Sequence, residues 1–517
     1  MTDMRRRLWL MSSYKRLVFC RYREVFMSNF SKKINDFVNR YYWIIFAGLA
    51  LYTAMLCFLR LDAGYVASWD EARHGISAYE MLQNKNFVLN TFNYETDYWN
   101  LKPPLSFYGI MMGFGLFGYS VMGLRFYSAL SYFLICILSG LFVKKHHGRL
   151  SSLLCMAFLC CNYLMLDHHG ARAGDADALY QLFFTIAMLA MMEIPKKHSR
   201  SYLCGICFSL AFLTKSYHAG IILLIGGLYM LITGTIKTLK LKEWLLFFLS
   251  AAAPAGIWAI ARFAQDGLTF FMTMLSEDVL SRSQTASEGH TGPFYYYLQE
   301  YFLDGKMIYG ILLLIVLVAG CYLVFRKKES VRPYVGYLLW LFVPLLAFSA
   351  VSTKLNWYNY PILVPLCMLA AIALGTCLEC EHVKGIFQKI VLAVTFAAVL
   401  FYGYHTLDAA VLSVHGDSLQ TFIADSVDRE EKTAGANAFI QVPQEIEDGS
   451  VWNAGNLFVA EIEGDYKCRP YGVAGYLECR EKKVLYISRE DYTNMKDMLT
   501  GEVLFETKDY LMVGENL

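Results

Sequence analysis

The chain has 517 residues, of which 56% are hydrophobic and only 17% are charged, and its mean hydropathy is +0.37. A soluble protein of this length carries more charge, so the composition excludes an ordinary soluble enzyme and indicates a polytopic membrane protein. Basic residues are scattered between apolar segments, which argues against nucleic-acid binding. Residues 408–517 carry 10 Lys and Arg against 21 Asp and Glu, while the rest of the chain carries 36 against 23. This asymmetry predicts a basic-flanked membrane body and an acidic soluble domain.

Residues 1–40 contain ten Lys and Arg and lead into a long apolar run without a small-residue cleavage site. We therefore expect a basic cytoplasmic segment followed by a retained first span rather than a cleaved signal peptide. The predicted membrane body covers residues 41–407.

Apolar runs in this body predict about eleven transmembrane helices, because each span needs about 20 residues. Basic connectors fall on every second loop, and the positive-inside rule assigns those loops to the cytoplasm. The runs lie near residues 41–60, 121–143, 151–166, 178–194, 201–214, 217–234, 243–262, 306–325, 333–352, 358–378 and 386–407.

The apolar segment 105–119 is short and rich in glycine. A span here would invert the charge alternation that follows, so we predict an interfacial or re-entrant segment that returns to the outer side. The first outer loop is then 61–120, and a second large outer loop is 263–305.

The outer loops carry the unusual polar residues of this sequence. Asp70 and Glu71 are adjacent carboxylates just past the first span, and ionisable residues at a membrane boundary indicate a functional site. Other charged and aromatic side chains fall on the same predicted face, as a membrane enzyme acting there requires. They are Arg73, Lys102, Arg125, His168, His169, Asp175, Asp177, Lys215, His290, Lys354 and Tyr358.

The ordered motifs of these loops resemble the GT-C membrane glycosyltransferases of the protein O-mannosyltransferase and aminoarabinose-transferase superfamily. The resemblance covers about residues 40–378. It is carried by Asp70-Glu71-Ala72-Arg73, Lys102-Pro103-Pro104-Leu105, Gly123-Leu124-Arg125-Phe126, Ala171-Arg172-Ala173-Gly174-Asp175-Ala176-Asp177-Ala178, Leu213-Thr214-Lys215, His290-Thr291-Gly292-Pro293-Phe294-Tyr295-Tyr296-Tyr297 and Thr353-Lys354-Leu355-Asn356-Trp357-Tyr358.

The resemblance implies an enzyme of the cytoplasmic membrane that moves a sugar from a polyprenyl-phosphate donor, with inversion, to an acceptor on the extracytoplasmic face. Asp70 is then the candidate base and Glu71 shapes its site, although by chemistry alone either carboxylate could serve. The departing phosphate is expected to be held by cationic and polar side chains, and further residues line the substrate site. The phosphate-binding candidates are Lys102, Arg125, Lys215, His290, Lys354 and Tyr358, and the substrate-site candidates are Arg73, Asp175 and Asp177.

No cofactor is expected to be required, but His168 and His169 are weak candidates for binding a divalent cation. The sequence Lys102-Pro103-Pro104-Leu105 lacks the following Gly-Lys of the protein mannosyltransferases. The acceptor is therefore left open between a glycolipid or cell-envelope glycan, as in lipid A modification, and a protein.

Structural roles compete with these assignments. Asp70 and Asp175 are also suited to cap helices, and Lys102 and Lys354 to extend along the membrane interface. A transporter or flippase for lipid-linked sugars is the alternative of another class, although we see no internal repeat.

Residues 408–517 show period-two stretches at 483–488 and 502–513 beside a helix-like piece at 418–438. This pattern predicts a small extracytoplasmic α/β domain. In an oxidising compartment Cys468 and Cys479 are candidates for a disulfide, with two free thiols as the alternative.

Overall fold

The computed structural model describes residues 29–281, 290–303, 307–326, 332–380, 383–427, 431–441, 454–469 and 471–517. Most of the segment predicted to be cytoplasmic, residues 1–40, lies outside these ranges.

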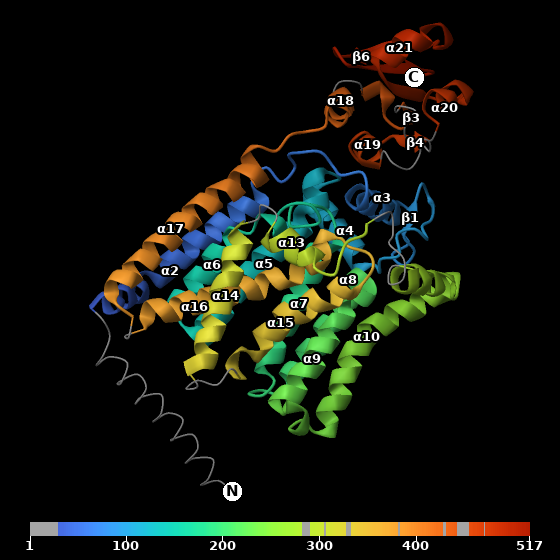
Figure 1. Ribbon diagram of the computed structural model, residues 1–517. Coiled ribbons are helices and arrows are strands. Elements are labelled where there is room, and N and C mark those ends of the chain that lie inside the picture. Colours follow the sequence, from blue (N-terminus) through green and yellow to red (C-terminus); the bar gives the residue numbers. More distant parts are fainter. Residues whose placement is uncertain are drawn as a thin grey trace.

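A bundle of long helices forms the body of the molecule, and the C-terminal α/β domain sits on one end of it (Figure 1). The helices of the body are α2 (Asn29–Phe58), α3 (Asp70–Gln83), α4 (Leu105–Phe117), α5 (Val121–His147), α6 (Arg149–Cys160), α7 (Ala176–Glu193), α8 (Arg200–Lys215), α9 (Gly220–Thr233), α10 (Leu241–Asp266), α11 (Thr269–Met274), α13 (Tyr296–Phe302), α14 (Met307–Arg326), α15 (Val335–Ala350), α16 (Leu363–Glu379) and α17 (Gly385–Leu407). A small hairpin, β1 (Thr91–Phe92) and β2 (Glu95–Thr96), follows α3.

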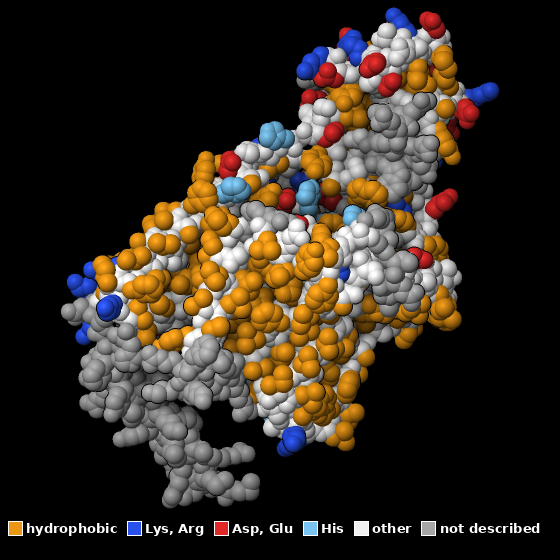
Figure 2. Space-filling model, viewed as in Figure 1, with side chains coloured by type: hydrophobic (Ala, Val, Ile, Leu, Met, Phe, Trp, Pro, Cys, Tyr) orange, Lys and Arg blue, Asp and Glu red, His pale blue; other side chains and the backbone are white. Residues whose placement is uncertain are grey.

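Within the described residues, seven helical stretches are long and apolar enough to cross a membrane, or eight if the bent pair α13 and α14 is one span. Three shorter apolar helices are α4, α6 and α15. Hydrophobic side chains cover the flank of the bundle, while charged side chains gather towards its ends (Figure 2). The chain thus has a multi-pass helical membrane body, whereas the count of eleven spans stays a prediction.

One of the seven stretches contains both α8 and α9, which fold back on each other. Tyr180, near the start of α7, donates to the carbonyl of His218 at the turn between them. Tyr229, near the end of α9, donates to the carbonyl of Met192 at the end of α7. Helix α9 therefore runs parallel to α7 and antiparallel to α8, and the turn that follows Lys215 lies beside the start of α7.

Helix α4 is the segment for which the sequence predicts an interfacial or re-entrant position. Its 13 residues span about 20 Å, less than the roughly 30 Å of a bilayer core. It packs closely on α5, where a Cβ at Gly113 would lie 2.0 Å from the carbonyl oxygen of Gly123. Met112 and Leu116 remain exposed on its other face. Helix α4 is therefore short for a span, and its interfacial or re-entrant position stays a prediction.

The C-terminal domain contains a five-stranded sheet with strand order β4-β3-β5-β7-β6. Strands β3, β4 and β5 are parallel, and β7 pairs antiparallel with β5 and β6. The elements are α18 (Ser418–Val427), β3 (Asn437–Ile440), α19 (Ala454–Phe458), β4 (Lys467–Arg469), α20 (Gly472–Glu478), β5 (Lys483–Ser488), α21 (Arg489–Met495), β6 (Glu502–Glu506) and β7 (Tyr510–Glu515).

The predicted disulfide between Cys468 and Cys479 is wrong for this structure, because both thiols are free. Cys468 pairs in register with Ala438 and packs into the core on that face of the sheet. Cys479 packs with Phe439 and Leu485 on the opposite face. Alternate residues of a strand point to opposite faces, so the sheet itself separates the two sulfur atoms.

Candidate active site

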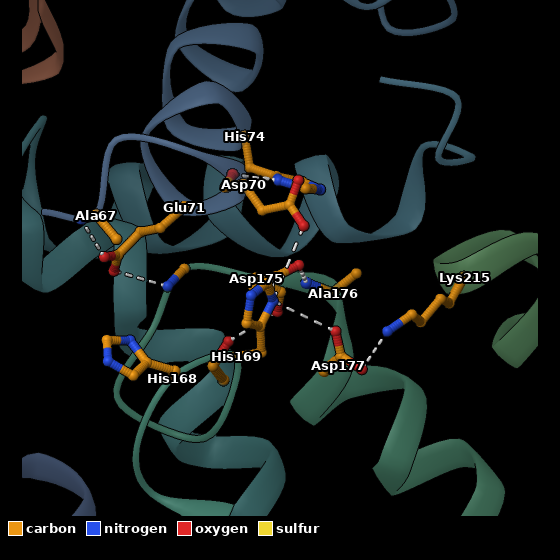
Figure 3. A network of polar contacts seen from close by, with 12 residues as sticks. Ala67, Asp70, Glu71, His74, His168, His169, Asp175, Ala176, Asp177 and Lys215 are labelled. Atoms are coloured by element: carbon orange, nitrogen blue, oxygen red, sulfur yellow. Dashed lines mark hydrogen bonds and ion pairs between the residues drawn. The ribbon is translucent and has the colours of Figure 1, made fainter. Parts of the chain in front are cut away.

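Helix α3 begins with the two adjacent carboxylates, which point in different directions (Figure 3). Successive residues of an α-helix are about 100° apart, so neighbours in the first turn reach different surroundings. The side chain of Asp70 is 23% exposed, whereas that of Glu71 is 5% exposed.

Asp70 belongs to a group of charged side chains that we call the Asp70 cluster, namely Asp70, Lys102, His169 and Asp175. The Lys102 Nζ atom lies 3.2 Å from Asp70 Oδ2 and 4.0 Å from Asp175 Oδ1. His169 Nδ1 forms an ion pair with Asp175 and lies 3.9 Å from Asp70 Oδ2. Trp357 stacks on the His169 ring at a centroid distance of 3.6 Å. Three separate loops thus bring these four side chains together.

The charges of the cluster stabilise one another. Burial raises the pKa of Asp70, but Lys102 and His169 outweigh it and hold that pKa below its usual value. Burial also raises the pKa of Asp175, but His169 and Lys102 lower it by more. The pKa of Asp175 therefore lies well below its usual value. Burial lowers the pKa of His169, yet Asp175 and Asp70 raise it overall. The cluster therefore keeps Asp70 in the carboxylate form that accepts a proton.

Glu71 faces the membrane body and pairs with Arg125, at 2.7 Å from Nε and 3.2 Å from Nη2. It also accepts from the backbone N–H groups of Ala67 and Gly174. The remaining Arg125 donors bind the carbonyls of Leu61, Ala63 and Tyr65. A guanidinium has five N–H groups to donate, and these five contacts use them all. Protein groups therefore take the place of the lipid phosphate that was expected from the sequence at Arg125.

A cavity of about 1090 Å³ is lined on its charged side by Asp70, Glu71, Arg125, His169 and Asp175. Its far wall is more apolar and comes from the start of α14 and the end of α17. Histidines surround the hollow at the junction between the body and the C-terminal domain (Figure 2). The residues of the far wall include Met307, Ile308 and Tyr309 of α14 and Phe401 and Tyr402 of α17, and the histidines that line the cavity are His168, His169, His405 and His415.

A second buried pair adjoins the Asp70 cluster. Asp177 forms an ion pair with Lys215, and its Oδ2 atom lies 3.8 Å from His169 Nδ1. The Lys215 ammonium also lies 5.4 Å from the ring centroid of Tyr358. These three predicted residues thus adjoin the Asp70 cluster through His169, although none of them is on the cavity wall.

Lys354 and His290 lie together, away from the cavity wall. The Lys354 ammonium donates to the carbonyls of Phe348, Ser349 and Val351 at the end of α15. Its backbone N–H donates to the carbonyl of exposed His290 at 3.0 Å. Cations at a helix C-terminus satisfy carbonyls that the helix leaves unbonded, so Lys354 caps α15. A phosphate contact by either residue stays a prediction.

The rim next to Asp70 is aromatic. Trp69 and Trp99 stack with centroids 6.4 Å apart, and they are 49% and 44% exposed. Arg73 lies 4.4 Å from the Trp99 ring and forms a bidentate ion pair with Asp97 at 2.9 Å. Arg73 therefore supports the aromatic pair and does not itself face the cavity.

Within the described residues, Asp70, His169 and Asp175 each offer one metal-ligand atom, and these atoms lie within 4.8 Å of one another. Two carboxylates and an imidazole are suitable ligands for a divalent cation. The Lys102 ammonium already supplies a positive charge between the two carboxylates. Asp175 also caps α7 by accepting from the Ala176 N–H. His168 lines the cavity but is not a member of this group.

Sequence reasoning missed Trp69 and Trp99 and the part of the cavity wall contributed by α14 and α17. Trp69 directly precedes Asp70, and Trp99 lies three residues before Lys102. This closeness in the sequence could have indicated that the tryptophans border the site. The distant histidines His405 and His415 had no motif to mark them.

The chain is similar in sequence to several membrane proteins. A family model described as dolichyl-phosphate-mannose-protein mannosyltransferase matches residues 101–258. Undecaprenyl phosphate-alpha-4-amino-4-deoxy-L-arabinose arabinosyl transferases from Pseudomonas savastanoi and Pseudomonas fluorescens are 27% and 24% identical over 63% and 61% of this chain. An uncharacterized protein of Aquifex aeolicus is 25% identical over 66% of the chain. The matches span 61%, 57% and 67% of these relatives' own lengths.

Solved structures share the fold. ArnT from Cupriavidus metallidurans, in a crystal structure bound to undecaprenyl phosphate, has a TM-score of 0.62 at 15% identity, covering 92% of this chain and 98% of that one. The oligosaccharyltransferase of Archaeoglobus fulgidus has a TM-score of 0.55 at 11% identity, covering 89% and 71%. The chain is thus similar in sequence and in fold to membrane glycosyltransferases of the GT-C type.

Proposed function

We propose that the protein is an inverting glycosyltransferase of the cytoplasmic membrane that takes a sugar from a polyprenyl-phosphate donor at the extracytoplasmic face. The observation that carries this proposal is the position of Asp70. Its ionised carboxylate borders a large cavity and lies 3.2 Å from the ammonium of Lys102. A base and a cation side by side are what sugar transfer from a phosphate ester needs.

In the proposed reaction an acceptor hydroxyl attacks the anomeric carbon of the donor sugar. The new carbon–oxygen bond forms as the bond from that carbon to the phosphate oxygen breaks, and the phosphate leaves with the electron pair. Asp70 takes the hydroxyl proton, and Lys102 stabilises the charge on the leaving phosphate. A phosphate that draws Lys102 away from Asp70 also makes this carboxylate a stronger base.

The apolar wall from α14 and α17 supports a lipid donor. It provides aromatic and aliphatic surface next to a charged pocket, which suits a phosphate joined to a polyprenyl chain. The undecaprenyl phosphate bound in the ArnT crystal structure is consistent with this class of donor.

The stacked pair of Trp69 and Trp99 supports a glycan or glycolipid acceptor. Exposed aromatic rings offer a flat, partly apolar surface, and the ring hydrogens of a sugar form a face of the same character. Trp69 precedes Asp70 and lines the cavity, so a sugar on this rim would hold its hydroxyl near the base.

We further propose that no metal ion is required, because Lys102 and His169 supply positive charge among Asp70, Asp175 and Asp177. Transfer by the purified protein is then expected to change less than about twofold with EDTA. A complete loss that Mg²⁺, Mn²⁺ or Zn²⁺ restores would instead assign a cation to Asp70, His169 and Asp175.

The direct test uses the purified protein in vesicles with an undecaprenyl-phosphate sugar labelled in the sugar, supplied with cell-envelope glycolipids or with envelope proteins. The proposal expects release of free undecaprenyl phosphate and label on the glycolipid. Label on protein would change the acceptor class but retain the reaction. An intact donor that only changes leaflet would indicate a flippase and contradict the proposal.

A further inference from the structure

We infer that the C-terminal domain positions the catalytic segment, and that Gln420 is the positioning residue through which it does so. The inference gives this domain a role in the proposed reaction and therefore rests on the proposed function. It is argued from contacts across the junction between the domain and the segment 61–69, which leads into α3.

The start of α3 has no cap of its own. Trp69 occupies the N-cap position, and no side chain caps the helix there. Instead, the backbone of the preceding segment receives the first helical N–H groups, since Ala72 donates to Ala67 and Arg73 to Trp69. The position of Asp70 therefore depends on where the segment 61–69 is held.

The membrane body holds this segment through Arg125 and Glu71. Arg125 donates to the carbonyls of Leu61, Ala63 and Tyr65, and Glu71 accepts from the N–H of Ala67. The residue between these contacts, Val66, is 1% exposed, and within the described part of the chain the hydrogen bonds of its backbone go to Gln420.

Gln420 of α18, in the C-terminal domain, binds the backbone of Val66. Its Oε1 atom accepts from the Val66 N–H at 2.8 Å, and its Nε2 atom donates to the Val66 carbonyl at 2.9 Å. One buried side chain thus satisfies both backbone groups of a residue that is four positions before Asp70. A buried amide that loses such a partner pays the full cost of desolvation, so this contact defines one position of the segment.

Close packing reinforces the same junction. A Cβ at Gly455 would lie 2.4 Å from the Val66 carbonyl oxygen and 2.7 Å from Gln420 Nε2, so glycine lets α19 approach. On α3, a Cβ at Gly75 would lie 2.3 Å from the Phe458 ring, which is itself fully buried. Two glycines, one on each side, allow the domain to lie directly against the catalytic helix.

A displacement of about 1 Å at a reacting group can cost about 10²-fold in rate. Gln420 does not line the cavity, so it is expected to affect turnover without contacting the donor. Gln441 offers a matched control, because its side-chain oxygen accepts from the Val473 N–H inside the same domain and away from the segment 61–69.

The test compares Gln420→Ala with Gln441→Ala in the full-length protein by hydrogen–deuterium exchange. Gln420→Ala is expected to speed exchange at the Val66 amide at least tenfold and to leave the Val473 amide unchanged, while Gln441→Ala does the reverse. Gln420→Glu keeps the acceptor but not the donor, so its effect should be intermediate. Unchanged exchange at Val66 in Gln420→Ala would overturn the inference, whatever the reaction proves to be.

The second measurement is transfer by the same variants. Gln420→Ala should lower kcat about tenfold or more and change the donor KM less than twofold, whereas Gln441→Ala should leave both within twofold. Faster exchange at Val66 with unchanged kcat would overturn the positioning role. Absence of transfer by the wild-type protein would count against the proposed function alone, because the exchange result does not depend on it.

Discussion

Asp70 and Glu71 are neighbours in the chain but lie in two contrasting regions of the molecule. Around Glu71, Arg125 and backbone groups saturate the charge, so that this region holds loops together. Both carboxylates border the cavity of about 1090 Å³, but the charges around Asp70 balance one another and leave its side chain 23% exposed, against 5% for Glu71. The same residue types thus serve structure where their partners are complete and are available for chemistry where solvent or substrate completes them.

Asp70→Asn should have the largest effect on sugar transfer, because it removes the proposed base. Loss of a general base lowers the rate about 10²- to 10⁴-fold, while Asn keeps the size of the side chain. We expect sugar transfer to fall by that factor while binding of the polyprenyl-phosphate donor is retained. Asp62→Asn is the matched control, because Asp62 is an exposed residue of the same loop. Equal activity of the two variants would remove Asp70 from the base role.

Lys102→Met should have the next largest effect, because it removes the cation proposed to face the leaving phosphate. Loss of one group that stabilises developing charge costs about 10²- to 10³-fold in kcat. Steady-state kinetics with a labelled donor measure this change, and Lys85→Met, at an exposed position, should stay near wild type. A Lys102→Met variant with normal kcat would show that the phosphate is held elsewhere.

Glu71→Gln should instead act on stability. Removing one partner of a buried ion pair typically costs about 3–5 kcal/mol, because the other charge stays buried. Thermal unfolding should therefore occur at a clearly lower temperature than for the wild type or for Glu95→Gln, whose position is exposed. A stable but inactive Glu71→Gln variant would assign Glu71 to the chemistry and erase the contrast with Asp70.

Glu461→Gln tests a smaller effect at the junction between the C-terminal domain and α3. Burial raises the pKa of Glu461 to about 7, and Tyr94 donates to its carboxyl group at 2.8 Å. The folded protein then binds an extra proton between about pH 4.5 and pH 7. The contribution of Glu461 to stability should fall as pH rises through this window, by at most about 3 kcal/mol, and stay level above it.

The Gln variant mimics the neutral carboxyl group and should reduce this slope and raise stability at pH 8. Thermal unfolding at pH 5 to 8 measures this pH dependence of stability, with Glu478→Gln, at an exposed position, as the control. Identical slopes in Glu461→Gln and the wild type would contradict the assignment.

Much of the architecture could be predicted because apolar length and charge alternation report directly on membrane helices. The turn that follows Lys215, between α8 and α9, is an example. The same alternation puts Lys102 and Asp70 on one face of the membrane, where the structure brings them together. Helix α2 begins at Asn29, before the predicted start near residue 41, because polar residues extend it beyond the apolar run. The number of spans is harder to predict, since α4, α6 and α15 are apolar but short.

The partners of the cations could not be predicted. Arg125 and Lys354 donate to backbone carbonyls that only the folded loops bring close. Nothing in a linear motif reports which carbonyls a loop leaves unbonded. The separation of Cys468 from Cys479 depends on strand register and face, which ten intervening residues do not reveal.

The most direct test of the central claim is to locate the polyprenyl phosphate on the protein. A photoreactive polyprenyl phosphate in vesicles should cross-link to the cavity wall formed by α14 and α17, giving labelled peptides that contain Tyr309 or Tyr402. Excess unlabelled lipid should abolish the label. Competed labelling confined to other surfaces, such as the small apolar cavity among α8, α9 and α10, would contradict the account.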